Sequence, residues 1–205
     1  MSLQRITLSL ALAIALGVSG CANATRFMTG LPPEVSVSQE GKFNPALSKQ
    51  IAAMVLVPRG NNLTDPQTMT RQLTDIAEGE LIRLGYSIVA GGTVQKVLAA
   101  SQAWNGDPDQ FDPLPIAREA GADLVLLVTI SQLSESTEYD STGRTSQRIA
   151  FSATAKAMGA ASGRVGWVAT ASGEARPREG GTKYVANEVV KALVAQLPSK
   201  VAKAP

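Results

Sequence analysis

The chain contains one cysteine, Cys21, and no histidine among its 205 residues. A cysteine thiol is a nucleophile that can form a thioether, but a lone cysteine has no partner in the chain for a disulfide. Without histidine, the Ser-His-Asp and Cys-His arrangements, the usual zinc sites and the commonest general base are excluded. We therefore expect Cys21 to be modified rather than catalytic, and we predict that the protein is not an enzyme and holds no cofactor or metal.

The sequence before Cys21 is typical of an export signal. Arg5 carries the only charge in the first twenty residues, and residues 6–18 are an apolar run. This run is shorter than the roughly 20 residues that a membrane-spanning helix needs. The sequence VSGC, which ends at Cys21, resembles the lipobox of bacterial lipoproteins. The resemblance implies a signal peptide over residues 1–20, cleavage between Gly20 and Cys21, and acylation of the Cys21 thiol with diacylglycerol and palmitate-type chains.

Acylated Cys21 would anchor the protein in membrane lipid, because each buried methylene contributes about 0.8 kcal/mol. Ala22, rather than an aspartate, follows the cysteine. By resemblance to enterobacterial sorting, this favours the outer membrane, with the folded part facing the periplasm. Two alternatives are an uncleaved signal anchor and a plain secretory signal with a chance cysteine.

Removal of residues 1–20 leaves 185 residues, enough for one domain with a sizeable core. Arg5 leaves with the signal, so 18 basic side chains face 17 acidic ones. This near-neutral balance, with only 4% aromatic residues, gives no sign of nucleic-acid binding. We predict a lipidated N-terminus and flexible tether over 21–50, a single α/β domain over 51–198 and a short tail over 199–205.

Hydrophobic periodicity and turn residues predict the elements of that domain. Strands are expected at 51–58, 86–90 and 123–130, followed by a hairpin of two strands at 151–158 and 165–170. Helices are expected from Asp65-Pro66 to Leu84, from Thr93 to Trp104, from Pro113 to Ala120 and from Thr182 to Pro198. The order predicts an α/β (α+β) sandwich, in which helices pack on a mixed parallel and antiparallel sheet of about five strands. The polar stretch 131–148 is expected to be a solvated loop.

Three phrases of this domain resemble a group of bacterial envelope lipoproteins. They are IAAMVLVP with LIRLGYSIVAGGTVQKVLA, then AREAGADLVLLVTISQ, and the strand ending ATASGEA. The group includes the curli secretion lipoprotein CsgG, the penicillin-binding-protein activator LpoB and the TolB amino-terminal domain, and the resemblance covers about residues 50–198. It implies a non-catalytic accessory that binds envelope proteins in assembly or regulation of a secretion or peptidoglycan-synthase machine. The alternative is a subunit of an oligomeric ring or channel for surface secretion, as in curli export.

The sequence departs from this group in two places. Residues 131–148 carry no outward apolar band, so we expect no membrane pore from this chain alone. The 29 residues between Cys21 and Ile51 form a short tether compared with that of the synthase activator, which puts an activator role in doubt.

Other residues have a chemical and a structural interpretation. Lys183 follows glycines at a helix start, where phosphate could bind, but the P-loop pattern is absent. Asp107, Asp109 and Asp112 offer oxygens for Ca²⁺, but their spacing is not that of an EF-hand, and Asp-Pro turns and helix caps explain them without a metal.

Glu78 and Glu80, two apart on a helix, are expected to point in different directions rather than to form a carboxylate pair. Trp104 and Trp167 are expected to belong to the core rather than to bind a partner.

Overall fold

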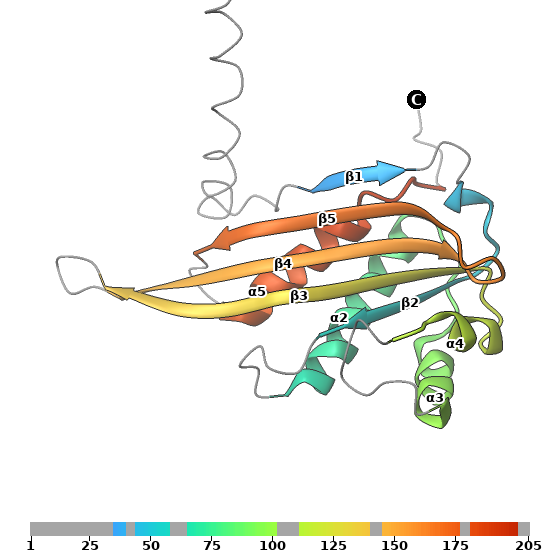
Figure 1. Cartoon of the computed structure of the whole chain (residues 1–205), viewed down its shortest axis with the longest axis horizontal. Coiled ribbons are helices and arrows are strands. Elements are labelled where there is room, and N and C mark those ends of the chain that lie inside the picture. The colour runs from blue at the N-terminus through green and yellow to red at the C-terminus, as the bar shows by residue number, and fades with distance from the viewer. Residues whose placement is uncertain are drawn as a thin grey trace, which may run out of the picture.

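The computed structural model describes residues 35–39, 44–57, 65–101, 111–139, 145–176 and 181–200. These residues form one five-stranded sheet in the order β1-β5-β4-β3-β2. Strand β2 is parallel to β3, and the other neighbours are antiparallel (Figure 1). The strands are β1 (Ser36–Gln39), β2 (Ile51–Leu56), β3 (Leu124–Tyr139), β4 (Thr145–Gly159) and β5 (Val165–Ala175). The mixed sheet with packed helices confirms the predicted fold class.

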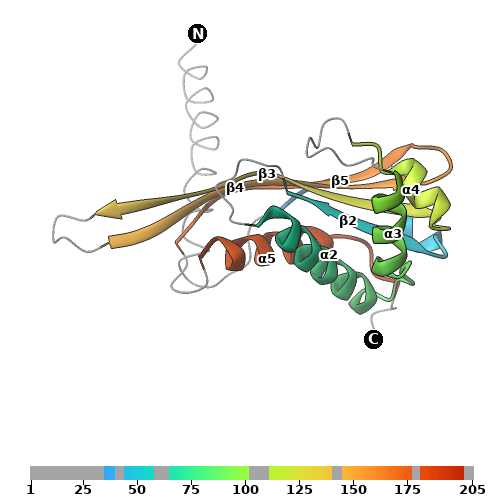
Figure 2. The same ribbon diagram turned by 90° about the horizontal axis from the view of Figure 1, so that it is seen from below.

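The sheet is covered on one face along much of its length and on the other face only at one end. Helices α2 (Pro66–Arg83) and α5 (Gly181–Val194) lie side by side on the first face (Figure 2). Helices α3 (Gly91–Ser101) and α4 (Leu114–Glu119) belong to a second hydrophobic cluster. A short 3-10 helix, η1 (Pro45–Leu47), precedes β2. We call the two sides of the sheet the helix face, which α2 and α5 cover, and the open face.

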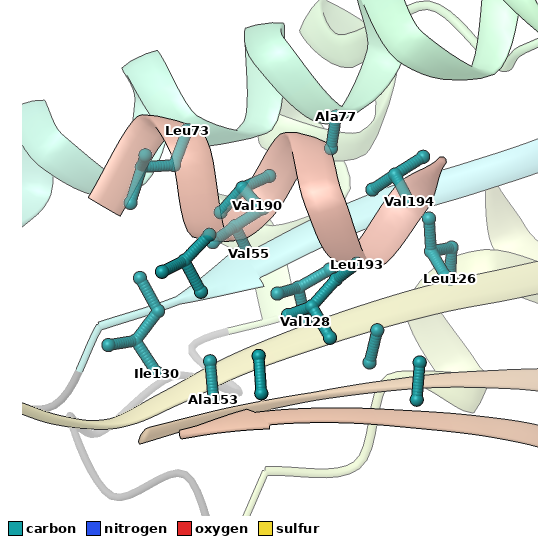
Figure 3. Close-up of a cluster of buried hydrophobic side chains, with 14 of the residues drawn as sticks. Val55, Leu73, Ala77, Leu126, Val128, Ile130, Ala153, Val190, Leu193 and Val194 are labelled. Carbon is teal, nitrogen blue, oxygen red and sulfur yellow. The ribbon is translucent and has the colours of Figure 1, made fainter. Parts of the chain in front are cut away.

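Alternation along the strands builds both clusters. On β3, Leu126, Val128 and Ile130 belong to the larger cluster on the helix face, together with residues of α2 and α5 (Figure 3). The intervening Val125 and Leu127 belong to the smaller cluster with α3 and α4. All six residues of β2 are buried, as expected of a strand packed on both faces.

The predicted strand at 86–90 is wrong, and a different segment completes the sheet. Ile51 exchanges two backbone hydrogen bonds with Ser87 and Val89, but Ile88 forms only an isolated bridge with Ile51 because α3 begins at residue 91. The fifth strand is β1, which pairs with β5 from Ser36↔Thr170 onwards. The sequence analysis placed these residues in the tether.

The expectation of a loop over 131–148 is also wrong. Strand β3 continues to Tyr139, β4 begins at Thr145, and the two remain paired to Tyr139↔Thr145. Both faces of this hairpin are largely exposed, so its sequence shows no apolar alternation, and the two strands stay together through their backbone pairing and polar side-chain contacts.

The helix ends follow the predicted caps in part. Asp65 caps α2 by accepting the backbone N–H of Thr68 at 3.0 Å, which helps to lower the pKa of Asp65 together with the Thr68 hydroxyl. Asp112 accepts the backbone N–H of Leu114 at the start of α4. Helix α5 starts at Gly181, so Thr182 does not cap it, and it ends at Val194 rather than near Pro198. Among the described helices, none is long and apolar enough to span a membrane.

Candidate interaction surface

The distal half of the β3–β4 hairpin projects beyond the rest of the sheet (Figure 1). Strand β2 pairs with β3 only as far as Thr129, and β5 pairs with β4 only from Ile149 onwards. Within the described ranges, β3 from Ile130 and β4 before Ile149 therefore have no strand on their outer sides. Backbone N–H and C=O groups on such edges are available for pairing with another chain.

A network of ion pairs holds the open face of this hairpin to the sheet. Arg148 on β4 contacts Glu138 on β3 at 2.6 Å and Glu174 on β5, whose Oε2 accepts the Arg148 Nε–H at 2.7 Å. Arg176, just after β5, contacts the second oxygen of Glu138 at 2.8 Å. Hydrogen bonds to Glu174 and then Glu138 raise the pKa of Arg148. Three neighbouring strand segments are thus linked through one guanidinium.

A second polar contact connects the hairpin to a helix on the opposite face. Glu135 of β3 accepts hydrogen bonds from the Gln147 amide at 2.9 Å and from the Thr182 hydroxyl at 2.8 Å. Since Thr182 lies in the first turn of α5, this carboxylate fixes the base of the hairpin relative to that helix. The hairpin is therefore constrained on both faces.

Exposed apolar side chains occur near the tip of the hairpin and on the edge strand β1. Tyr139, at the end of β3, is 75% exposed, and Val37 on the edge strand β1 is 45% exposed. Away from α3 and α4 the open face is largely polar: short hydroxyl or amide side chains on it are Ser38, Gln132, Ser134, Ser152, Thr154, Thr170 and Ser172. Such a surface suits contacts with proteins through backbone edges and a few side chains, rather than enclosure of a small molecule.

The described residues show where several predicted candidates lie. Trp167 is 1% exposed, which confirms its assignment to the core. Glu78 and Glu80 do point apart, because Glu80 pairs with Arg83 whereas one oxygen of Glu78 is buried without a hydrogen-bond partner. Lys183 is exposed in the first turn of α5.

The remaining candidates are Asp112 and several residues outside the described ranges. Asp112 caps a helix, and no group of three potential metal-ligating side chains is found among the described residues. Asp107, Asp109 and Trp104 lie outside the described residues, as do Gly20 and Cys21. The lipidation and cleavage assignments remain predictions.

Contacts of the C-terminal segment with the body of the domain were not predicted, and they include Lys200 of the predicted tail. The Tyr86 hydroxyl donates to the Pro198 carbonyl at 2.5 Å, and the backbone N–H of Lys200 donates to the Leu84 carbonyl at 2.8 Å. The Lys200 ammonium also lies 5.2 Å from the centre of the Tyr86 ring and donates to the Ser48 carbonyl. Burial raises the pKa of Tyr86 to about 12. Residues 198–200 therefore belong to the folded unit.

The charged residues of the hairpin were also missed as a set. Their signal was present, because Glu138 and Arg148 are opposite charges on two segments of high Ser and Thr content. These ion pairs can be predicted only when the hairpin register is known, since cross-strand neighbours are set by strand pairing rather than by sequence spacing.

No protein-family model and no curated protein sequence matches the chain. Among solved structures, a variant of the PelC dodecamer from Paraburkholderia phytofirmans superposes with a TM-score of 0.52 at 16% identity, covering 82% of this chain and 99% of that chain. A lipoprotein from Neisseria meningitidis gives a TM-score of 0.49 at 19% identity, covering 72% of this chain and 96% of that chain. The C-terminal domain of LpoB from Salmonella enterica gives 0.41 at 15% identity, covering 68% and 88%. The likeness to PelC shows a shared fold.

Proposed function

We propose that this protein is a lipid-anchored envelope protein that acts as a non-catalytic accessory by binding other envelope proteins. In this proposal, acylated Cys21 inserts into the outer membrane and the domain faces the periplasm. The machine served would be of the secretion or peptidoglycan-synthase type. The observation that carries the proposal is the β3–β4 hairpin, which projects from the sheet and is held in place by ion pairs on its open face.

The outer edge of β3 supports binding by strand addition. Proteins commonly protect exposed edges with lysine, proline or bulges that prevent unwanted pairing. The stretch from Ile130 to Tyr139 contains neither lysine nor proline, and its one register irregularity lies at its start, between Ile130 and Gln132. An extended segment of a partner can pair with such an edge, gaining affinity from backbone hydrogen bonds and specificity from alternate side chains.

The position of β1 supports a function close to the membrane. Because β1 begins at Ser36, only residues 22–35 separate the proposed anchor, Cys21, from the sheet. Fully extended, these 14 residues reach at most about 50 Å. This is half the reach expected when the tether was taken to extend to residue 50, and it favours partners near the anchoring membrane.

The test is site-specific photocrosslinking in intact envelopes with the full chain carrying a C-terminal tag. A photoreactive amino acid replaces exposed Tyr139 on the hairpin, and the same amino acid at exposed Lys183 on α5 is the control. We expect the Tyr139 position to crosslink a defined secretion or peptidoglycan-synthase protein, identified by mass spectrometry, that the Lys183 position does not. Equal crosslinking from both positions, or none from Tyr139, contradicts the proposal.

A second candidate is a subunit of an oligomeric ring for secretion. The shared fold with PelC favours it, since that likeness covers nearly all of the PelC chain and PelC forms a dodecamer. The discriminating measurement is the mass of the detergent-extracted full chain by light scattering. A concentration-independent monomer contradicts the ring, whereas a discrete large assembly supports it.

A further inference from the structure

Open strand edges occur on both sides of the sheet. Strand β1 ends the sheet on one side, and its outer edge over Ser36–Ser38 has no neighbouring strand among the described residues. On the other side, no described strand pairs with the outer edge of β3 beyond Thr129, where its pairing with β2 ends. One molecule thus offers two separate strand edges, neither of which carries lysine or proline.

The strand directions make these two edges complementary. Strands β1 and β5, β5 and β4, and β4 and β3 are each antiparallel, so β1 runs opposite to β3. When two copies lie side by side in the same orientation, β1 of one copy therefore meets β3 of the next in antiparallel fashion. This pairing gives the perpendicular hydrogen bonds of an antiparallel ladder and continues the sheet from copy to copy.

The exposed apolar side chains fit the same arrangement. Val37 lies on the helix face, since it pairs with buried Ala169, and Tyr139 lies on that face because it is six residues beyond buried Leu133. Joining β1 to the distal part of β3 places these two side chains on the same side of one continuous sheet. Both lose water contact there, which stabilises the association.

Charge disfavours the alternative in which β3 pairs with β3 of a second copy. An antiparallel pairing centred on Glu135 would place this carboxylate against its own copy, and like charges directly opposite are destabilising. Strand β1 is uncharged over Ser36–Ser38, so it meets the acidic β3 edge without repulsion.

We infer that copies of this chain associate head to tail, with the outer edge of β1 in one copy paired to the outer edge of β3 beyond Thr129 in the next. This inference rests on the ring candidate above and specifies its interface. Followed across β5 and β4, the strand register aligns β1 with Leu126–Thr129 of β3 in the same copy. The proposed contact lies beyond Thr129 on β3 of the next copy. Neighbouring copies are therefore displaced along the strand direction. A similar stagger between strands accompanies tilt and closure in barrels.

The test uses cysteine crosslinking in envelopes that contain the full chain. Three variants are made: Val37→Cys, Thr137→Cys, and the double variant that carries both. Each is treated with a short bis-maleimide and analysed on denaturing gels. Wild type controls for reaction at Cys21, and Thr170→Cys combined with Thr137→Cys controls for random collision, because Thr170 is exposed on the open face.

Head-to-tail pairing predicts a distinctive pattern. Neither single variant crosslinks alone, the two single variants expressed together give a dimer, and the double variant gives a ladder of dimer, trimer and higher species. Crosslinking of either single variant with itself indicates a two-fold contact and overturns the inference. So does a ladder of equal strength from the Thr170→Cys control pair.

Another variant tests the proposed interface independently of the ring candidate. Val37→Lys places a charge at a half-exposed edge position, where we expect the fold to be retained and the mass to drop to that of a monomer. If wild type is a large assembly and Val37→Lys leaves its mass unchanged, the interface is wrong while the ring stands. If wild type is a monomer at every concentration, the ring and the interface both fail.

Discussion

Glu78 on α2 has one carboxylate oxygen that is buried without a hydrogen-bond partner. Burial, and then the nearby charge of Asp75, raise the pKa of Glu78 above its ordinary value. A raised pKa means that the native state holds the proton more tightly than the unfolded chain. The resulting stability is present below the unfolded pKa and is lost as pH rises through the raised native pKa.

We therefore expect Glu78→Gln to raise the midpoint of thermal unfolding at about pH 7 and to change it less near pH 3, where Glu78 is largely protonated in both states. Circular dichroism melts at the two pH values measure this difference. Glu80→Gln is the control, because Glu80 is paired with Arg83 at the surface. An equal shift at both pH values would show that packing, not ionisation, is responsible.

The contact between Tyr86 and the C-terminal segment makes a second prediction at this scale. Tyr86→Phe removes the hydroxyl that donates to Pro198 but keeps the buried ring. We expect a loss of about 1 kcal/mol in the free energy of unfolding, the usual contribution of one such hydrogen bond. Urea denaturation measures it, with Tyr184→Phe at a 40% exposed position as control. No difference between the two variants would contradict a structural contribution of the tail.

Cys21 carries the remaining prediction about a single residue. We expect Cys21→Ala to release the protein from the membrane fraction and to abolish labelling by a clickable palmitate analogue. The unchanged chain should be labelled and should require detergent for extraction. Labelling of the Cys21→Ala variant would show that acylation takes place elsewhere, and persistent membrane binding without label would point to an uncleaved signal anchor.

Among the elements, the hairpin depends on polar contacts rather than on a core of its own. The side chains of Arg148, Glu138 and Glu174 are each more than one-third exposed, so their ion pairs are screened by solvent and contribute little to global stability. Their effect is local, because they connect strand segments with few buried side chains among the described residues.

We expect Arg148→Met to accelerate amide hydrogen exchange in 134–139 and 145–148 while the melting temperature changes little. Hydrogen-exchange mass spectrometry measures this, and high salt should produce the same acceleration in the unchanged protein. Arg83→Met removes an ion pair on α2 and serves as control. Uniform exchange changes across the sheet would show that Arg148 supports the whole fold instead of the hairpin.

The elements also show which parts of the fold can be predicted from the sequence. The start of α2 was predicted correctly because its signals, Asp65 and Pro66, act on neighbouring residues. Strand β1 and the outer half of the hairpin were missed because they are polar and exposed, so no hydrophobic period marks them. The segment at 86–90 was overpredicted because its apolar residues are buried by packing without a ladder. The candidate surface depends on where distant strands stop pairing, which sequence does not encode locally.

At the scale of the whole molecule, the hairpin and the core are separable. The core lies between the helices and the proximal parts of the strands, while most residues beyond Ser134 on β3 are exposed. Replacing residues 138–146 by Asn-Gly, a favoured two-residue hairpin turn, should therefore leave a folded protein. We expect near-unchanged melting but loss of higher assembly. Light scattering and calorimetry measure both, and a failure to fold would contradict this separation.

The edge position of β1 has a mechanical consequence for a protein held by its N-terminus. Pulling force through the tether first reaches β1, which is joined to β5 by only four residue pairs, whereas Asp123 and the β2–β3 ladder hold the chain from Lys49 onwards. Detachment of β1 would release residues 36–48 and add at most about 47 Å of extended chain to the tether. The same event would remove one of the two proposed docking edges. Tension on the anchor would then increase the reach of the domain and weaken its assembly at the same time.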